Sequence, residues 1–352
     1  MTRFRLERRE RTPVLVQLLL PVVAVLAALA LCSGLIRLAG TGVIRAYSLL
    51  FLSTFQSGYD LEDTLIKAAP LVLTGLAVAV AFRAKFWNIG AEGQLMAGAI
   101  LAGFIGERTS LPAFSLVPLM LLGAAAAGAL WALLPALLKV RLKVDDVVTT
   151  LLLNSIMLYG VMALLEGPWK DPRGGYPYSP SIRPAAEFPI LVGAVLHLGV
   201  FLALFAAVLV WWAMARTTLG FAIRAVGHNP VASAYAGIPV GRTLLVAAII
   251  SGALAGLAGA GEVGGVRYQV TSDLSSGYGY AGIVIATLAE LNPLAVVPAA
   301  LFFAVIFNGA GSMARSTGVP IYLADVIQGV ALLTMVAGRL FTVYRLRVAR
   351  HA

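Results

Sequence analysis

Charged residues are scarce in this chain of 352 residues. Asp, Glu, Lys and Arg together make up 12% of it, whereas 60% of the residues are hydrophobic. Ordinary soluble domains carry about 25% charged residues. The composition and the mean hydropathy of +0.91 therefore argue strongly against a soluble enzyme. A spanning helix needs about 20 apolar residues, so a chain of this length has room for about ten of them. We expect an all-α, membrane-embedded helical bundle.

Cysteine, histidine and lysine are also few. Cys32 is the only cysteine, which excludes a disulfide framework within the chain and a cysteine-based zinc site. His197, His228 and His351 are too scattered for metal-ligand spacing. None of the five lysines directly follows a glycine, as the lysine of a P-loop must, so the chain cannot hold ATP in that manner. We expect no catalytic residue, no metal site and no cofactor on this chain.

Two glycine motifs, at 259–264 and 277–282, fit the dinucleotide-binding pattern G-x-G-x-x-G. Neither follows a predicted strand or opens a soluble βαβ unit, which that pattern requires. Small residues also let membrane helices approach each other closely. We therefore interpret both motifs as helix-packing positions.

The apolar runs predict ten helices, and their flanking charges predict how the chain is oriented. With the N-terminus inside, the inner segments carry 17 basic residues and the outer segments nine. The positive-inside rule therefore places both termini in the cytoplasm, which also accounts for the net charge of +10 without a nucleic-acid partner. One run, 278–290, is too short to cross about 30 Å by itself. The ten runs are 14–38, 64–82, 87–106, 112–138, 147–166, 190–214, 243–264, 278–290, 294–312 and 321–338.

Two outer segments differ from simple loops. Residues 43–58 are apolar but too short to span, and we expect them to lie along the outer interface. Residues 167–189 contain six prolines among polar residues, which is typical of an extended loop. The run 14–38 is too long for the apolar part of a cleaved signal peptide, so we interpret it as a retained first span.

A faint internal repeat is also present. Val117-Pro118 is matched by Val297-Pro298, and Asp146-Val147-Val148 is similar to Asp325-Val326-Ile327. The offset of about 180 residues shifts each segment by five spans and reverses its direction. An inverted repeat of this kind is common in transporters with a central pathway.

Polar side chains interrupt the apolar pattern between residues 82 and 94. Asn88, Glu92 and Gln94 lie within seven residues, and glycines separate them. Ionisable groups at membrane depth are costly and usually face a pathway or a partner. Two interpretations stay open: these side chains contact a substrate, or they only satisfy each other and free backbone groups. Further polar positions on apolar runs complete the candidate substrate pathway, namely Asn154 and Glu262.

The inner loop 217–239 predicts a short helix over 230–236. Asn229 is a good N-cap, Pro230 suits the first turn, and Gly237 suits the left-handed residue after the last turn. Small residues along it would allow another surface to come close, which favours a docking element over a structural elbow. The candidate coupling residues are Gly227, Asn229, Pro230, Ala232, Ala236 and Gly237, with Ser233 and Ala234 among the small residues between them.

Several stretches together resemble the permease subunits of bacterial ATP-binding-cassette importers for nucleosides and simple sugars, in the ribose and branched-chain amino-acid permease superfamily. The likeness covers most of residues 60–340, and the run 88–94 is its most specific part. Ala289-Glu290-Leu291 departs from the family pattern, in which glycine and a basic residue are more usual. The matching stretches are LTGLAVAVAFRAKFWNIGAEGQLMAGA, RTTLGFAIRAVGHNPVASAYAGIPVGR, SGALAGLAGAGEV and LNPLAVVPAALFFAVIFNGAGSMARSTGVPIYLADVIQG.

The resemblance implies a multi-pass protein of the bacterial inner membrane that works within a larger complex. It implies a second permease subunit in a heterodimer, cytoplasmic ATP-binding subunits that hydrolyse ATP, and an extracytoplasmic substrate-binding protein. The coupling helix of the family maps onto 229–237. The chain is then one transmembrane permease domain, with an extra N-terminal span and interfacial segment in 1–63 and the permease core in 64–340. The alternative is a secondary transporter driven by an ion gradient, whose ion site would recruit Glu92, Glu262 and Asp325.

Overall fold

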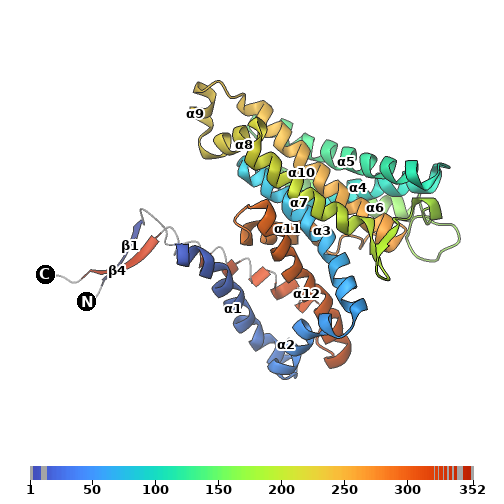
Figure 1. Ribbon diagram of the computed structural model, residues 1–352, viewed down its shortest axis with the longest axis horizontal. Coiled ribbons are helices and arrows are strands. Elements are labelled where there is room, and N and C mark those ends of the chain that lie inside the picture. Colours follow the sequence, from blue (N-terminus) through green and yellow to red (C-terminus); the bar gives the residue numbers. More distant parts are fainter. Residues whose placement is uncertain are drawn as a thin grey trace. The chain divides into compact units, whose positions relative to one another are not determined.

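The computed structural model is almost entirely helical (Figure 1). It describes residues 3–8, 14–320 and 344–349, and, between these last two ranges, positions 322–323, 325–327, 329–330, 333–334 and 337–338. The helices are α1 (Val14–Leu38), α2 (Val43–Leu52), α3 (Gly58–Arg83), α4 (Ala91–Arg108), α5 (Ala113–Leu137), α6 (Asp146–Glu166), α7 (Leu198–Arg216), α8 (Thr218–His228), α9 (Pro230–Tyr235), α10 (Val240–Glu262), α11 (Tyr278–Leu288) and α12 (Pro293–Thr317). Short 3-10 turns lie at Ser53–Phe55 and Pro184–Ala186, and π-helical turns extend α5 over Leu138–Leu142 and α10 over Val263–Arg267.

The chain divides into two compact units, and the first combines its two ends. Unit 1 comprises Met1–Thr54 and Ile306–Ala352. In it, α2 packs against the last part of α12, because a Cβ at Gly309 would overlap the backbone of Leu50. Strand β1 (Arg3–Arg8) pairs antiparallel with β4 (Tyr344–Ala349). No alternating pattern in these two segments predicted the ladder, which is a short addition to an otherwise helical bundle.

Unit 2, Phe55–Val305, is built around α10. This helix packs against α3, α4 and α5, and glycines permit the contact: a Cβ at Gly98 or Gly128 would overlap the backbone of α10. The two G-x-G-x-x-G motifs also lie in such contacts. A Cβ at Gly259 would overlap Leu95, and one at Gly279 would overlap Glu92, so the interpretation of both motifs as packing positions is confirmed.

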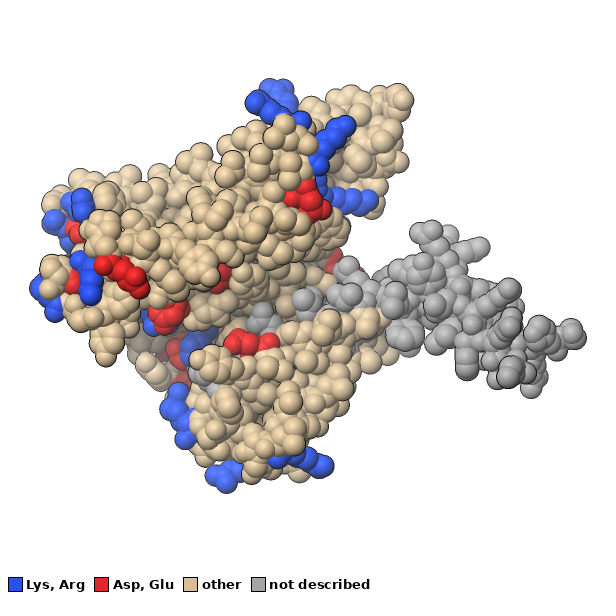
Figure 2. All heavy atoms as spheres, turned by 180° about the vertical axis from the view of Figure 1, so that it is seen from behind, with Lys and Arg blue, Asp and Glu red and all other residues tan. Residues whose placement is uncertain are grey.

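Among the described residues, six helices are long and apolar enough to cross a membrane, and α1 with α2, bent by 119°, makes a seventh if the two count as one broken span. Figure 2 shows a face of unit 2 on which Lys and Arg gather at the two ends, with mostly uncharged side chains between them. Both observations fit a helical membrane bundle. The short run expected at 278–290 forms α11, which is only 11 residues long. The run expected at 321–338 lies only in part within the described residues.

One expected span is wrong in its first turns. The run 190–214 is helical only from Leu198, because β2 (Ile190–Val192) and β3 (Leu196–His197) form a hairpin before it. Its turn contains Gly193 at φ +66, and the Glu62 carboxylate on α3 accepts hydrogen bonds from the N–H groups of Ala194 (2.8 Å) and Val195 (2.9 Å). The backbone donors of the turn are thereby satisfied outside a helix.

Unit 2 has two opposite ends that matter for function. The hairpin end carries β2, β3 and the proline-rich segment 167–189, which is an extended loop as expected. The α9 end carries α8 and α9, which lie beyond the far end of α7 in Figure 1. Helix α7 connects the two ends.

Candidate functional site

The backbone leaves the helical conformation between α3 and α4, at residues 84–90. Lys85 adopts φ +56, and the buried side chain of Phe86 anchors the turn against Ala81, Ala136 and Ala248. Non-helical backbone at membrane depth must be satisfied by protein groups or line a cavity. The polar residues predicted for the pathway lie at this break.

Asn88 and Gln94 satisfy much of the break and each other. The Asn88 amide donates to Gln94 Oε1 and to Ser251 Oγ on α10, both at 2.9 Å. In return Asn88 Oδ1 accepts from the Gln94 amide and from the Gly90 N–H, again at 2.9 Å. Ser251 Oγ donates onward to the carbonyl of Ala77 on α3 at 2.7 Å. This buried network joins α3, α4 and α10.

Asn154 satisfies the other side of the same break from α6. Its Oδ1 accepts from the Gly93 N–H at 2.9 Å, and its amide donates to the Ile89 carbonyl at 2.9 Å and to the Tyr280 hydroxyl at 3.3 Å. Thr150, one turn earlier, accepts from the Ile89 N–H through Oγ1 at 3.2 Å. The structure therefore brings Asn88, Gln94 and Asn154 together around one stretch of backbone.

Glu92 and Glu262 lie elsewhere, near the start of α11. Glu92 Oε2 accepts from the Gly279 N–H at 2.7 Å, where a carboxylate also complements the positive end of the helix dipole. Glu262 is buried on α10, within electrostatic reach of Lys67 and Arg267. Both carboxylates are within electrostatic reach of Tyr278, at the first residue of α11.

Sequence reasoning missed a partly buried ion pair that closes the break at the α9 end. Asp146 Oδ2 accepts from Lys139 Nζ at 2.5 Å and from the Trp87 N–H at 2.5 Å. Lys139 also donates to the Lys85 carbonyl at 2.9 Å. The signal was an acid at a helix start, three residues after the basic segment 139–143, but its partner at Trp87 is not readable from spacing.

The short helix of the inner loop forms as predicted. Helix α9 spans Pro230–Tyr235, and Asn229 Oδ1 caps it by accepting from the N–H groups of Val231 (3.0 Å) and Ala232 (3.1 Å). Gly237 follows with φ +81, as expected of a glycine after the last turn. Val231 and Tyr235 leave 63% and 90% of their surface exposed, so the helix presents an apolar face with nothing covering it in the described part of the chain.

Two residues of the inner loop 217–239, Gly227 and Ser233, are buried. Ser233 is buried and donates from Oγ to the Asn229 carbonyl at 2.8 Å, so it is not part of the exposed small-residue face. This placement corrects the expectation for Ser233, and its cause is the capped turn that directs the side chain toward its own backbone. Gly227 is buried where a Cβ would overlap the Arg83 carbonyl. Pro230, Ala232, Ala234 and Ala236 are exposed.

Comparison with known proteins agrees with this architecture. A family model described as "Branched-chain amino acid transport system / permease component" matches residues 61–336. The glucose ABC transporter permease protein of Haloferax volcanii is 35% identical, over 98% of this chain and 94% of its own length. The guanosine ABC transporter permease protein of Bacillus subtilis is 37% identical, over 90% of this chain and 92% of its own.

A third relative extends the pattern. The nucleoside ABC transporter permease protein of Lactococcus lactis is 32% identical, over 88% of each chain. No solved structure matches the chain. The family model covers the break between α3 and α4 and the whole of α8 and α9.

Proposed function

The chain belongs to the permease-component family of branched-chain amino acid transport systems and is a multi-pass inner-membrane subunit of an ABC transporter, and on that premise we propose that it imports a nucleoside or simple sugar. Membership implies an ATP-binding subunit, which hydrolyses the ATP, and a substrate-binding protein. The substrate class follows the relatives, whose names specify glucose, guanosine and nucleoside. A second permease subunit completes a heterodimer in this proposal, and the chain carries no cofactor of its own.

The observation that carries the coupling role is the exposed, capped helix α9. Its caps fix the helix independently of the membrane core, and Val231 and Tyr235 offer an apolar contact at the end of unit 2. An exposed apolar face of this kind is typical of a protein contact. We assign this face to the ATP-binding subunit, with Asn229, Pro230, Ala232, Ala236 and Gly237 as the coupling residues and Gly227 as the close-packed position beneath them.

Closure of the ATP-binding subunits moves this helix and shifts the permease between outward- and inward-facing states. We propose that the polar residues of the pathway respond to this shift, namely Asn88, Glu92, Gln94, Asn154 and Glu262. Asn88, Gln94 and Asn154 do so through the network that joins α3, α4, α6 and α10. Glu92 and Glu262 do so around α11.

Orientation and topology are part of the proposal. Ten spans with an inverted repeat would place both termini in the cytoplasm, and the antiparallel pairing of β1 with β4 supports a common side for the two ends. Long helices begin at Ala113 and Pro293, near the two halves of the faint repeat. Cysteines at the exposed positions Tyr176 and Tyr235, in a Cys32→Ala background, should label from opposite sides of intact cells. Labelling of both from outside contradicts this orientation.

The test of function is uptake by the reconstituted complex. The chain, its second permease and its ATP-binding subunits are placed in proteoliposomes with the substrate-binding protein, and uptake of guanosine, ribose and glucose is followed. We expect uptake that requires ATP and a substrate-stimulated ATP hydrolysis. Uptake that instead follows an imposed ion gradient without nucleotide would favour a secondary transporter and contradict the proposal.

A further inference from the structure

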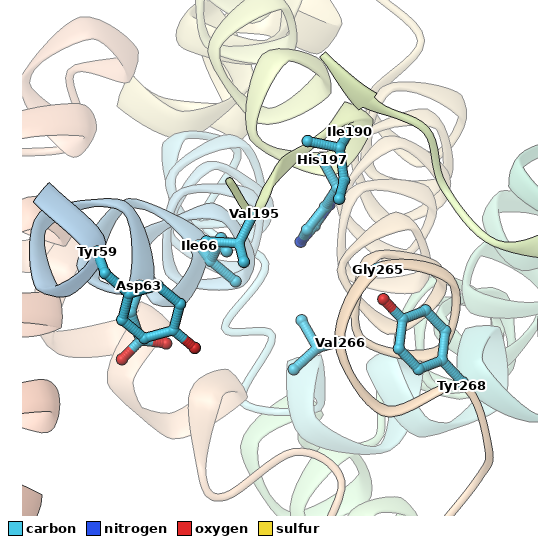
Figure 3. A pocket seen from close by; sticks show the side chains of 9 residues that line it. All are labelled: Tyr59, Asp63, Ile66, Ile190, Val195, His197, Gly265, Val266 and Tyr268. Atoms are coloured by element: carbon cyan, nitrogen blue, oxygen red, sulfur yellow. The ribbon is translucent and has the colours of Figure 1, made fainter. Parts of the chain in front are cut away.

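The hairpin end of unit 2 contains a pocket of about 190 Å³ that the coupling and pathway arguments do not use. It lies between the first turns of α3, the β2–β3 hairpin and the π-helical turn after α10 (Figure 3). Polar side chains reach it from each of these elements: Asp63 and Tyr59 from α3, His197 from the hairpin, and Tyr268 from the residue after the π turn. In Figure 3 the imidazole tip of His197 and the hydroxyl of Tyr268 turn toward the centre of the pocket.

His197 is the unusual member of the set. Its side chain is buried, with 3% of the residue exposed, yet Nε2 has no hydrogen-bond partner among the described residues. Buried polar groups in native proteins almost always have a partner, so each exception needs an explanation. His197 is one of the residues that line the pocket.

The other ring nitrogen fixes which proton His197 carries. Nδ1 accepts a hydrogen bond from the Gly199 N–H at 3.1 Å and thereby caps α7. Burial lowers the pKa of the imidazole from 6.5 to about 4, so the ring is neutral at physiological pH. A neutral imidazole that accepts at Nδ1 must carry its proton at Nε2. The pocket therefore contains a fixed N–H donor.

The remaining lining groups complement a donor with acceptors and hydroxyls. The Asp63 carboxylate accepts hydrogen bonds and is balanced by Lys67, whose Nζ lies 2.7 Å from Oδ2. The hydroxyls of Tyr59 and Tyr268 can donate and accept. The carboxylate would repel an anion, and the N–H donor offers a cation no lone pair. A neutral ligand with several hydroxyls can instead donate to the carboxylate, accept from the imidazole and bond to both tyrosine hydroxyls.

The volume of the pocket limits the size of the ligand. A volume of about 190 Å³ corresponds to about six water molecules, more than a single bridging water requires. It is smaller than the roughly 300–1,000 Å³ of pockets that enclose larger organic ligands. We propose that this pocket binds one neutral polyhydroxylated ring, either a free sugar or the ribosyl part of a nucleoside, with His197 Nε2–H as donor and Asp63 as acceptor.

This inference rests on the proposed function and deepens it. The proposed orientation places the hairpin end on the outer face, where a substrate-binding protein delivers its ligand. A weak ring site there would receive substrate before it enters the membrane. The sequence offered no signal for it, because His197 lies in an apolar run with no recognisable spacing to Asp63 or Tyr268.

Two substitutions at His197 separate binding from folding. Asn places an acceptor close to that of Nδ1 and is a good N-cap, but lacks a donor that reaches as far as Nε2. Gln places an amide donor near the Nε2 position and removes the cap acceptor. His197→Asn should therefore lose the ring site and keep the fold, whereas His197→Gln should keep much of the site and lose stability. If His197 had only a structural role, ring binding would follow stability, so His197→Asn would bind better than His197→Gln.

A second pair of substitutions tests the pocket without replacing any of its polar side chains. A Cβ at Gly265 would overlap the His197 imidazole and displace it, whereas a Cβ at Gly261, four residues earlier, meets open space. Gly265→Ala should weaken binding, and Gly261→Ala is the matched control that should not. Thermal unfolding of each variant shows whether the fold is retained.

Binding is measured by saturation-transfer NMR on the full chain in lipid nanodiscs, with ribose, glucose, guanosine and guanine as probes. We expect transfer to sugar-ring protons, at least tenfold weaker in His197→Asn and Gly265→Ala than in the wild type, His197→Gln or Gly261→Ala. Transfer to ribose or glucose identifies a free sugar as the ligand, and transfer to guanosine ribosyl protons alone identifies a nucleoside. Transfer to guanine, or equal transfer in His197→Asn and the wild type, overturns the proposal.

The reconstituted uptake assay distinguishes this failure from failure of the proposed function. ATP-driven uptake by the wild-type complex without any ring binding to the chain would overturn the pocket and leave the permease function intact. Ring binding that follows the expected variant order, without ATP-driven uptake, would overturn the permease function instead.

Discussion

Asn88 and Gln94 form a reciprocal amide pair, in which each side chain donates to the oxygen of the other at 2.9 Å. Both residues are buried, and the pair closes the break between α3 and α4. Because Ser251 joins the same network from α10, a movement of α10 against α4 must disturb these bonds. The break is thus held by side-chain hydrogen bonds that a conformational change can exchange.

The amide pair should be strongly coupled. Asn88→Ala leaves the Gln94 amide and the Gly90 N–H without their buried partner, which costs about 1–3 kcal/mol for each unsatisfied group. Gln94→Ala should cost a similar amount, and the double variant less than the sum of the two. Thermal unfolding midpoints of the four proteins in detergent give the coupling. Additive losses would show that the two side chains act independently.

Glu92→Gln should lower uptake without lowering membrane yield. Gln keeps an oxygen acceptor for the Gly279 N–H but removes the negative charge next to α11. A carboxylate at this depth is costly unless it has a task beyond one neutral hydrogen bond. Yield is measured by quantitative blotting of membranes and transport in the reconstituted complex. Normal uptake together with normal yield would remove Glu92 from the pathway, and low yield would assign it to the fold.

The α9 loop and the break between α3 and α4 differ in how far the sequence could predict them. Asn229, Pro230 and Gly237 act within one local turn, so capping rules predicted the helix, its cap and the left-handed residue after it. Asn88 instead depends on Ser251, 163 positions away, and no spacing rule shows which polar neighbour it chooses. The sequence also did not predict the hairpin. Ile190, Leu191 and Val192 are apolar and continue the apolar run of α7, yet they lie exposed in a strand.

Substitutions in α9 should uncouple transport and leave insertion intact. A six-residue helix is marginal without its caps, and loss of the Asn229 cap should cost about 1 kcal/mol. Gly237→Val should strain a backbone at φ +81 that β-branched residues rarely adopt. We expect both to reduce substrate-stimulated ATP hydrolysis and uptake together, and Ala232→Trp to release the ATP-binding subunit on purification. Full stimulation in Gly237→Val and Ala232→Trp would reduce the loop to a structural elbow.

Glu290→Gly should stabilise the chain. Glu290 and Leu291 are consecutive non-glycine residues in the left-handed region, at φ +50 and +60. Glycine removes the cost of that conformation at Glu290, and after its own larger entropy loss the gain should be up to about 1 kcal/mol. Arg83 donates from Nε to the Leu291 carbonyl at 3.2 Å, so this bond survives the change. Glu290→Ala is the control, since it removes the carboxylate but keeps the strain, and an equal gain in both variants would assign the effect to charge.

Stability should fall on acidification because of His197. Its pKa is about 4 in the folded protein, lowered by burial, and 6.5 when unfolded, so between these values the unfolded chain binds more protons. Stability is therefore fully present above about pH 6.5 and is lost as the pH falls toward 4, by up to about 3 kcal/mol for the whole shift. Unfolding midpoints between pH 7.5 and 4.5 measure the loss. His197→Asn keeps the cap and has nothing to titrate, so its midpoint should change less over the same range. An equal slope in the variant and the wild type would show that other groups control the acid sensitivity and that the buried imidazole does not.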